Sequence, residues 1–248
     1  MSAGPIDAAG VSSVGGREEN QDRFHVDDEL AVVSDGMGGY EGGAKAAGLA
    51  TAAVVEAWQY GMNVQRGEAG VIEAFQRAND DVRAERDVTE GTDRMGATLV
   101  VAVRRSLDDD ASTWVLAHVG DSPGYLVTAE GAAQLTIDHT LPALLLQDGV
   151  LTPDEAEQHP YKNVLLRAIG AEPEVEVDVN EIILRTGEAL VLCSDGLSGM
   201  LTADEIGDLV RGAASASAAA EVLVSTAVTR GASDNVTSVV IRHRPSTA

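Results

Sequence analysis

The stretch Ala31-Val-Val-Ser-Asp35-Gly-Met-Gly-Gly39 joins an apolar run to an aspartate and a cluster of glycines. The run has the length and the β-branched residues of a buried strand, so Asp35 falls where the strand ends and the backbone turns. The glycines permit positive φ in a sharp turn and leave space for a cation or a phosphate. Taken alone, the segment fits an ordinary glycine-rich turn about as well as it fits a ligand site.

Three further segments place an aspartate beside an apolar run, and they are Ala117-His-Val-Gly-Asp121-Ser122, Val191-Leu-Cys-Ser-Asp195-Gly196 and Ser233-Asp-Asn-Val236. Ordinary turns do not require such repetition, whereas strand ends can bring scattered carboxylates to one edge of a sheet. Mg²⁺ and Mn²⁺ prefer carboxylate, carbonyl and water oxygens to nitrogen or sulfur. The four segments therefore predict a site for a hard divalent cation.

Length and composition indicate a soluble globular protein and favour one domain over the alternative of two small ones. The 248 residues are 44% hydrophobic, which is enough to bury a large core. No apolar stretch approaches a membrane span, and residues 1–10 lack the basic start and apolar core of a secretory signal. The single Cys193 cannot form an internal disulfide and is expected to be a small buried residue. We therefore expect a cytoplasmic protein.

The charge balance argues against two classes of partner. The chain has 40 Asp and Glu residues against 17 Lys and Arg, a formal charge of −23. A surface with this field repels nucleic-acid phosphates and anionic lipid, so neither nucleic-acid binding nor membrane binding is expected. Much of the acidity also fits a simple solvated surface. Both interpretations can hold, because a metal cluster needs only a few of these carboxylates.

Strand-like and helix-like segments come in runs of each kind and are not separated by a linker. This pattern favours an α+β fold with antiparallel sheets over a strictly alternating one. Helices are expected over 44–58 and 69–86, and strands over 97–103, 113–118 and 125–128. The three strands, separated by polar and turn-forming residues, predict an antiparallel meander.

Arg17 lies upstream of the first aspartate motif, in the segment Arg17-Glu-Glu-Asn-Gln-Asp22. A guanidinium presents a planar fork suited to bidentate phosphate binding, and it stays charged under all working conditions. A lone arginine beside acidic residues usually forms only a surface ion pair. The phosphate interpretation of Arg17 therefore depends on the neighbouring cation motifs.

Nine short motifs recur along the chain in a fixed order: Arg17-x-x-Asn-Gln-Asp22, Asp35-Gly-Met-Gly-Gly39, Gly96-Ala-Thr98, Val119-Gly-Asp-Ser122, Asp138-His-Thr140, His159-Pro160 with Asn163, Arg167-Ala-Ile-Gly170, Ser194-Asp-Gly-Leu197 and Asp234-Asn-Val-Thr237. Together they resemble the ordered motifs of the protein phosphatase 2C family, the metal-dependent serine/threonine protein phosphatases, and most of all its compact bacterial signalling members. Each motif is weak by itself, but the ordered set is highly specific.

The resemblance implies the fold α-β-β-α, a central β-sandwich of two antiparallel sheets flanked by helices. It also implies a binuclear Mn²⁺ or Mg²⁺ centre at one end of the sandwich. We expect a single catalytic domain over residues 11–243, a flexible N-terminal tail over 1–10 and a C-terminal tail over 244–248.

The resemblance also implies a role for each matching metal ligand. Asp35 would bridge the two ions, and Gly36 would contribute its carbonyl oxygen. Asp195 and Asp234 would complete the coordination of one ion. Asp22 would bind the other ion through a water molecule.

Two more residues of the site follow from the same resemblance. Asp121 matches a position that, with Asp195, holds a third and weaker ion in bacterial relatives. Arg17 would bind the substrate phosphate and act with Asp35 in catalysis. Three polar residues would orient ligands and not bind the ions themselves: Asn20, Ser34 and Asn235.

The implied reaction is hydrolysis of phosphoserine and phosphothreonine by direct attack of a metal-activated water. No covalent phosphoenzyme is needed, in agreement with Cys193, which lacks the Cys-x5-Arg pattern because position 199 is glycine. The expected partners are phosphorylated proteins and a cognate serine/threonine kinase, and the expected state is a monomer.

Three positions depart from the family pattern. Relatives carry a histidine where this chain has Met37 or Tyr40, and that histidine is a candidate acid for the leaving group. The family's arginine after Gly-Asp-Ser is replaced by Pro123. These departures leave an alternative function open: a catalytically weak or inactive regulator that binds a phosphoprotein or a kinase.

Overall fold

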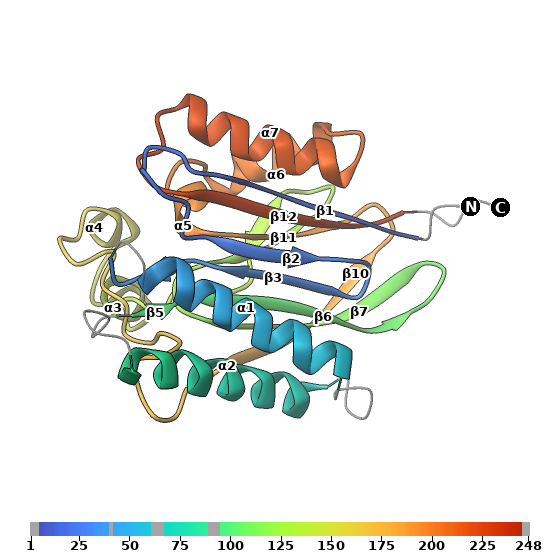
Figure 1. Cartoon of the computed structure of the whole chain (residues 1–248). Helices are drawn as coiled ribbons and strands as arrows, with labels where there is room; N and C mark the ends of the chain where they lie inside the picture. The colour runs from blue at the N-terminus through green and yellow to red at the C-terminus, as the bar shows by residue number, and fades with distance from the viewer. Residues whose placement is uncertain (1–4, 40–41, 61–66, 89–94, 245–248) are drawn as a thin grey trace.

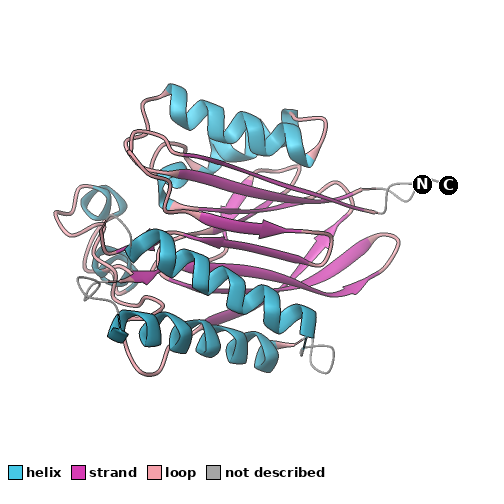
Figure 2. Cartoon of the chain, viewed as in Figure 1, coloured by secondary structure: helices cyan, strands magenta, loops and turns pink. Residues whose placement is uncertain are grey.

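Two five-stranded antiparallel sheets lie face to face in the computed structural model, which describes residues 5–39, 42–60, 67–88 and 95–244 (Figures 1 and 2). The first sheet contains, in spatial order, β1 (Ile6–Ser13), β12 (Val236–His243), β11 (Ala189–Cys193), β8 (Gly124–Val127) and β9 (Ala132–Gln134). The second contains β10 (Asp178–Arg185), β7 (Ala111–Val119), β6 (Leu99–Leu107), β3 (Leu30–Ser34) and β2 (Arg23–Val26). A small third sheet pairs β4 (Gly36–Met37) with β5 (Gly96–Ala97).

Helices cover both outer faces of the sandwich (Figure 1). α1 (Gly42–Tyr60) and α2 (Glu68–Val88) pack on the second sheet, and α6 (Ala203–Gly212) and α7 (Ala216–Thr229) pack on the first. Three short helices lie near one end of the sandwich: α3 (Leu141–Gln147), α4 (Pro153–Glu157) and α5 (Asp195–Ser198). This α-β-β-α arrangement confirms the predicted fold class.

The continuous apolar runs are explained by burial on both faces of each sheet. In β3, Leu30 and Val32 join the core under α1 and α2, whereas Ala31 and Val33 join the core between the sheets. Successive strand side chains point to opposite faces, so a central strand of this sandwich has no polar face. Burial of one Val or Leu side chain stabilises the fold by about 1.5–3 kcal/mol. Cys193 is buried, as predicted, in the core under α6 and α7.

The predicted meander is wrong at its third strand. β7 pairs with β6 and β10, whereas β8 pairs with β11 and β9 in the other sheet. Between β7 and β8 the chain turns at Gly120, whose φ is 104°, and passes through Pro123. Proline has no N–H with which to continue a ladder, so the chain leaves one sheet before it enters the next.

The predicted N-terminal tail needs correction, because β1 begins at Ile6 and pairs with β12 along its whole length. Every residue of β1 is half-buried, so the segment lacks the strong polar and apolar contrast by which a strand is recognised in sequence. Of the predicted C-terminal tail, residues 245–248 lie outside the described residues. Within the described ranges, no helix combines the length and the apolar character needed to cross a membrane.

Candidate metal and phosphate site

Strand register brings two of the predicted aspartates to the same end of the second sheet. Arg23, the first residue of β2, pairs with Ser34, the last residue of β3. Asp22 and Asp35 therefore lie just beyond one pair of strand ends, although 13 positions separate them in the chain. The start of β1 and the end of β12, where Ile6 pairs with His243, lie at the opposite end of the sandwich (Figure 1).

Strand register in the first sheet brings a second pair of aspartates, Asp195 and Asp234, together in the same way. Cys193 at the end of β11 pairs with Ser238 in β12, and the Ser194 N–H donates to the Thr237 carbonyl at 3.1 Å. Asp195, which opens the one-turn helix α5, and Asp234, which precedes β12, are thus placed together. Hydrogen bonds from Ser194 and Thr237 to Asp22 join these strand ends, so all four aspartates lie at one end of the sandwich.

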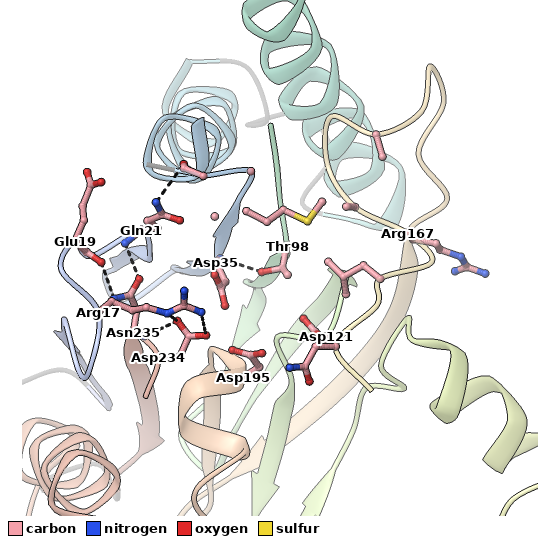
Figure 3. A pocket seen from close by; sticks show the side chains of 18 of the residues that line it. Arg17, Glu19, Gln21, Asp35, Thr98, Asp121, Arg167, Asp195, Asp234 and Asn235 are labelled. Atoms are coloured by element: carbon pink, nitrogen blue, oxygen red, sulfur yellow. Dashed lines mark hydrogen bonds and ion pairs between the residues drawn. The ribbon is translucent and has the colours of Figure 1, made fainter. Parts of the chain in front are cut away.

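A cleft of about 710 Å³ opens at this end. Its lining includes six of the seven predicted site residues: Arg17, Asp35, Gly36, Asp121, Asp195 and Asp234. Figure 3 shows Asp35, Asp121, Asp195 and Asp234 arranged around a common space, with Arg17 beside Asp234. The seventh, Asp22, does not line the cleft and is only 3% exposed.

Asp22 is held beneath the cleft by two hydroxyl groups. Its Oδ2 accepts hydrogen bonds from Ser194 Oγ at 2.7 Å and from Thr237 Oγ1 at 2.6 Å. Asn20 Oδ1 accepts from the Asp22 N–H at 3.1 Å. The sequence singled out Asn20 as an orienting residue but gave no role to Ser194 or Thr237.

Thr98 fixes the backbone at Asp35. Its Oγ1 accepts from the Asp35 N–H at 2.9 Å, and its own N–H donates to the Asp35 carbonyl at 2.8 Å. Ser34 Oγ donates to the Thr98 carbonyl at 2.7 Å, and Thr98 Oγ1 lies 2.6 Å from Ser122 Oγ. These contacts join the turn after β3 to the turn after β7, which carries Asp121.

Gly36 is required by a close approach of two backbone segments. A Cβ atom at Gly36 would lie 2.0 Å from the carbonyl oxygen of Gly43 in α1. Only glycine allows this approach, which leaves the Gly36 backbone in the lining of the cleft.

Arg17 forms a bidentate ion pair with Asp234. Arg17 Nε lies 2.8 Å from Asp234 Oδ1, and Nη2 lies 2.7 Å from Oδ2. The Arg17 side chain is 59% exposed, so its guanidinium remains accessible from the cleft. Asn235 supports the same corner, because its Oδ1 accepts from the Gln21 N–H at 2.8 Å and its Nδ2 donates to the carbonyls of Val14 and Glu19.

Three carboxylates of the cleft are buried near one another, and their pKa values rise in consequence. Burial raises the pKa of Asp35 well above its usual range, and the charges of Asp22 and Asp195 raise it further. Burial also raises the pKa of Asp195, as does the nearby charge of Asp234. The pKa of Asp121 is raised to about 7, first by burial and then by Asp195.

These residues fit a hard divalent cation. Asp22 Oδ1 and Asp195 Oδ1 are buried and have no hydrogen-bond partner among the residues that the structure describes. A buried carboxylate oxygen without a partner is costly, and a cation satisfies it while cancelling like-charge repulsion. The donor set consists of carboxylate oxygens and a glycine backbone, which suits Mg²⁺ and Mn²⁺ better than softer ions.

The raised pKa of Asp22 predicts a pH-dependent stability of the metal-free protein. Burial raises this pKa from 3.8 to about 6, so between these values the folded state holds more protons than the unfolded state. The contribution of Asp22 to the free energy of unfolding therefore falls as pH rises, by on the order of 3 kcal/mol. Urea unfolding of Asp22→Asn and wild type in EDTA at pH 4 and pH 7 should show the variant gaining relative stability at the higher pH. An unchanged difference would contradict the burial of a titrating Asp22.

A second group of metal-type side chains lies outside the cleft. The ligand atoms of His118, His139 and Asp178 are within 4.8 Å of one another. His139 Nδ1 accepts from the Gly120 N–H at 3.2 Å, which places the proton of the neutral ring on Nε2. Arg167 Nη1 donates to Asp178 Oδ1 at 2.8 Å and already supplies a positive charge there. We therefore interpret this group as a hydrogen-bonded cluster and not as a metal centre.

Asp138 is a half-buried carboxylate near Asp195 to which the sequence gave no role. Burial raises its pKa to about 6, and the charge of Asp195 raises it as well. Gln134 Nε2 donates to its Oδ1 at 2.7 Å. Of the two positions where relatives carry a histidine, Met37 lines the cleft, and Tyr40 lies outside the described residues.

An acidic cleft with one bidentate arginine, at the end of an α-β-β-α sandwich, defines the class of metal-dependent phosphatases. Residues 9–235 match the sequence model of the family described as protein phosphatase 2C. The chain belongs to the protein phosphatase 2C family.

Individual relatives agree with this assignment. The serine/threonine phosphatase Stp of Listeria monocytogenes is 34% identical over 230 residues, which cover 92% of this chain and 88% of the relative. The protein phosphatase PhpP of Streptococcus pneumoniae is 34% identical over 217 residues, which cover 86% and 85%. The serine/threonine phosphatase PstP/Ppp of Mycobacterium tuberculosis superposes with a TM-score of 0.87 at 29% identity, over 96% of this chain and 99% of the relative.

Proposed function

We propose that this chain hydrolyses phosphoserine and phosphothreonine in proteins with the help of Mn²⁺ or Mg²⁺. The observation that carries the proposal is the convergence of Asp35, Asp121, Asp195 and Asp234 beside Arg17 in one cleft. A similar structure, the catalytic domain of PstP, was solved in complex with two manganese ions, at 28% identity and a TM-score of 0.84. This supports two ions in the present cleft.

We assign the cation ligands as the sequence suggested. Asp35, the Gly36 carbonyl, Asp195 and Asp234 would hold the cations in the cleft, and the buried Asp22 would support one of them. Asp121 with Asp195 offers a third position, supported by their shared lining of the cleft. When bound, the cations supply positive charge that acidifies a water and neutralises the phosphoryl oxygens.

The chain's own residues bind and orient the phosphoryl group. Arg17 presents a planar fork to two phosphoryl oxygens, a geometry that it already shows towards the Asp234 carboxylate. The guanidinium can offer the same fork to a phosphoryl group in place of the Asp234 carboxylate. Thr98 holds the Asp35 backbone fixed, so little reorganisation is needed at the centre.

We also propose partners, a localisation and an oligomeric state for the enzyme. The partners are phosphorylated proteins and the kinase that forms them, the localisation is cytoplasmic, and the active form is a monomer with one catalytic domain that includes β1. The names of the relatives support the phosphoprotein substrates, and the charge of −23 argues against nucleic acid and membranes. The names of these two relatives, both phosphatases, favour an enzyme over an inactive regulator.

A phosphate-release assay tests the proposed function. Purified chain with Mn²⁺ should release inorganic phosphate from a phosphothreonine peptide, and EDTA should abolish the release. The unphosphorylated peptide serves as the blank. Tight binding of the phosphopeptide without turnover at any Mn²⁺ concentration would instead identify a regulator and overturn the proposal.

A further inference from the structure

Large exposed apolar side chains gather in one part of the molecule. Among the described residues, seven of thirteen lie between positions 137 and 166: Ile137, Leu144, Leu146, Val150, Tyr161, Val164 and Leu166. The others are scattered over α2, β6, β10, α7 and the turn after β1: Val14, Ile72, Val88, Leu107, Ile183 and Val228. Scattered apolar residues are normal on a protein surface, whereas a local concentration marks an interaction site.

Three of these side chains form what we call the apolar strip, defined as Tyr161, Val164 and Leu166. They are 58%, 49% and 51% exposed. Leu166 itself lines the catalytic cleft, as do its neighbours Asn163 and Leu165. The strip is therefore continuous with the wall of the cleft and is not a separate surface.

The backbone of the strip is held in place, so the exposure of its side chains is built into the fold. The Leu166 N–H donates to the His139 carbonyl at 2.7 Å, and the Val164 N–H donates to the Tyr161 carbonyl at 3.1 Å. A β-bridge joins Leu165 to Thr140. The main chain at Leu166 is therefore fixed relative to the cleft.

The far side of the cleft has the opposite chemistry. Glu18 and Glu19 are exposed and line the cleft next to Arg17. Figure 3 shows Glu19 and Arg17 on one side of Asp35 and Asp195, and Arg167, which follows the strip in sequence, on the other. The catalytic aspartates thus lie between an acidic wall and an apolar one.

We infer that the cleft selects phosphorylated segments that carry a bulky apolar residue on one side of the phosphoresidue and a basic residue on the other. This rests on the proposed function and names the substrate class of the same site. The apolar residue contacts Leu166 and Val164, and the basic residue faces Glu18 and Glu19. The cleft is larger than a phosphate group requires, which leaves room for flanking residues.

Competing phosphothreonine peptides test this inference. A set of peptides carries leucine or serine on one side and lysine or serine on the other, with each arrangement made in both directions along the peptide. Each kcat/KM is divided by the value of the same enzyme on p-nitrophenyl phosphate, which has no flanking residues. In the wild type, the peptide with leucine and lysine should be preferred over the peptide with two serines by roughly tenfold or more, in one of the two directions.

The double variant Val164→Ser and Leu166→Ser should lose the leucine preference, by roughly tenfold in the ratio, and keep the lysine preference. Glu18→Gln with Glu19→Gln should do the reverse, by about threefold at low salt and less at high salt. The matched control is Val228→Ser on α7, which replaces a 39% exposed apolar residue far from the cleft in sequence and should leave both ratios unchanged. Circular dichroism confirms that each variant is folded.

Two results would overturn the inference. One is an equal loss on leucine-flanked and serine-flanked peptides, or no loss at all. The other is a change of oligomeric state in the double variant, seen by size-exclusion chromatography, with unchanged peptide ratios, because the strip would then join two copies of the chain. A wild type that hydrolyses neither peptides nor p-nitrophenyl phosphate with Mn²⁺ would instead refute the proposed function.

Discussion

Replacing Asp35 or Asp195 with asparagine should lower kcat/KM for a phosphothreonine peptide by at least about 10³-fold, because each change removes a charge at the centre of the cation cluster. Asparagine keeps the size of the side chain, so the fold should persist. The measurement is phosphate release at saturating Mn²⁺, together with a thermal unfolding curve for each variant.

The matched control for this prediction is Asp208→Asn on α6. Asp208 is exposed and pairs with Arg211, away from the cleft. The control should retain wild-type turnover. If Asp35→Asn and Asp195→Asn also retain it, the cleft is not the site of the reaction.

Arg17→Ala should lower kcat/KM by on the order of 10²-fold, because the phosphoryl group loses a bidentate partner. Arg17→Lys should recover only part of this loss, since an ammonium cannot present two parallel donors. The matched control is Arg230→Ala, which removes an exposed arginine that pairs with Glu205 at 2.6 Å. Michaelis kinetics with the peptide and with free phosphate as a competitive inhibitor provide the measurement. Equal inhibition constants for wild type and Arg17→Ala would contradict a phosphate-binding role for Arg17.

Much of the fold follows from the apolar pattern along the chain. Uninterrupted runs such as 99–103 indicate strands buried on both faces, and the structure places alternate residues of β6 in different cores. The pattern does not say which sheet a strand joins. β8 reads like the next strand of a meander, yet it pairs with β11 because the turn around Gly120 and Pro123 leads the chain across the sandwich.

The cleft was predictable from local motifs, whereas its supporting contacts were not. Asp35, Asp121, Asp195 and Asp234 each stand in a recognisable turn at the end or the start of a strand. The hydroxyls that hold Asp22 come from Ser194 and Thr237, which are 172 and 215 positions away in the chain. Such partners are determined by strand register between distant segments, and short-range sequence signals do not contain it.

The ion pair between Arg17 and Asp234 has the same origin, since 217 positions separate its members. The sequence indicated one residue for phosphate and the other for a cation, without their contact. The apolar strip was equally hidden, because composition shows apolar residues but not which of them the folded chain leaves exposed.

The central claim is that aspartates from distant segments share a cluster of divalent cations. Calorimetric titration of Mn²⁺ into the EDTA-treated and dialysed protein tests it most directly. The wild type should bind at least two ions per chain, in agreement with the donor set of the cleft. Asp35→Asn should bind neither ion at the Mn²⁺ concentrations that saturate the wild type. Binding of the same number of ions with the same affinity by Asp35→Asn would contradict the account.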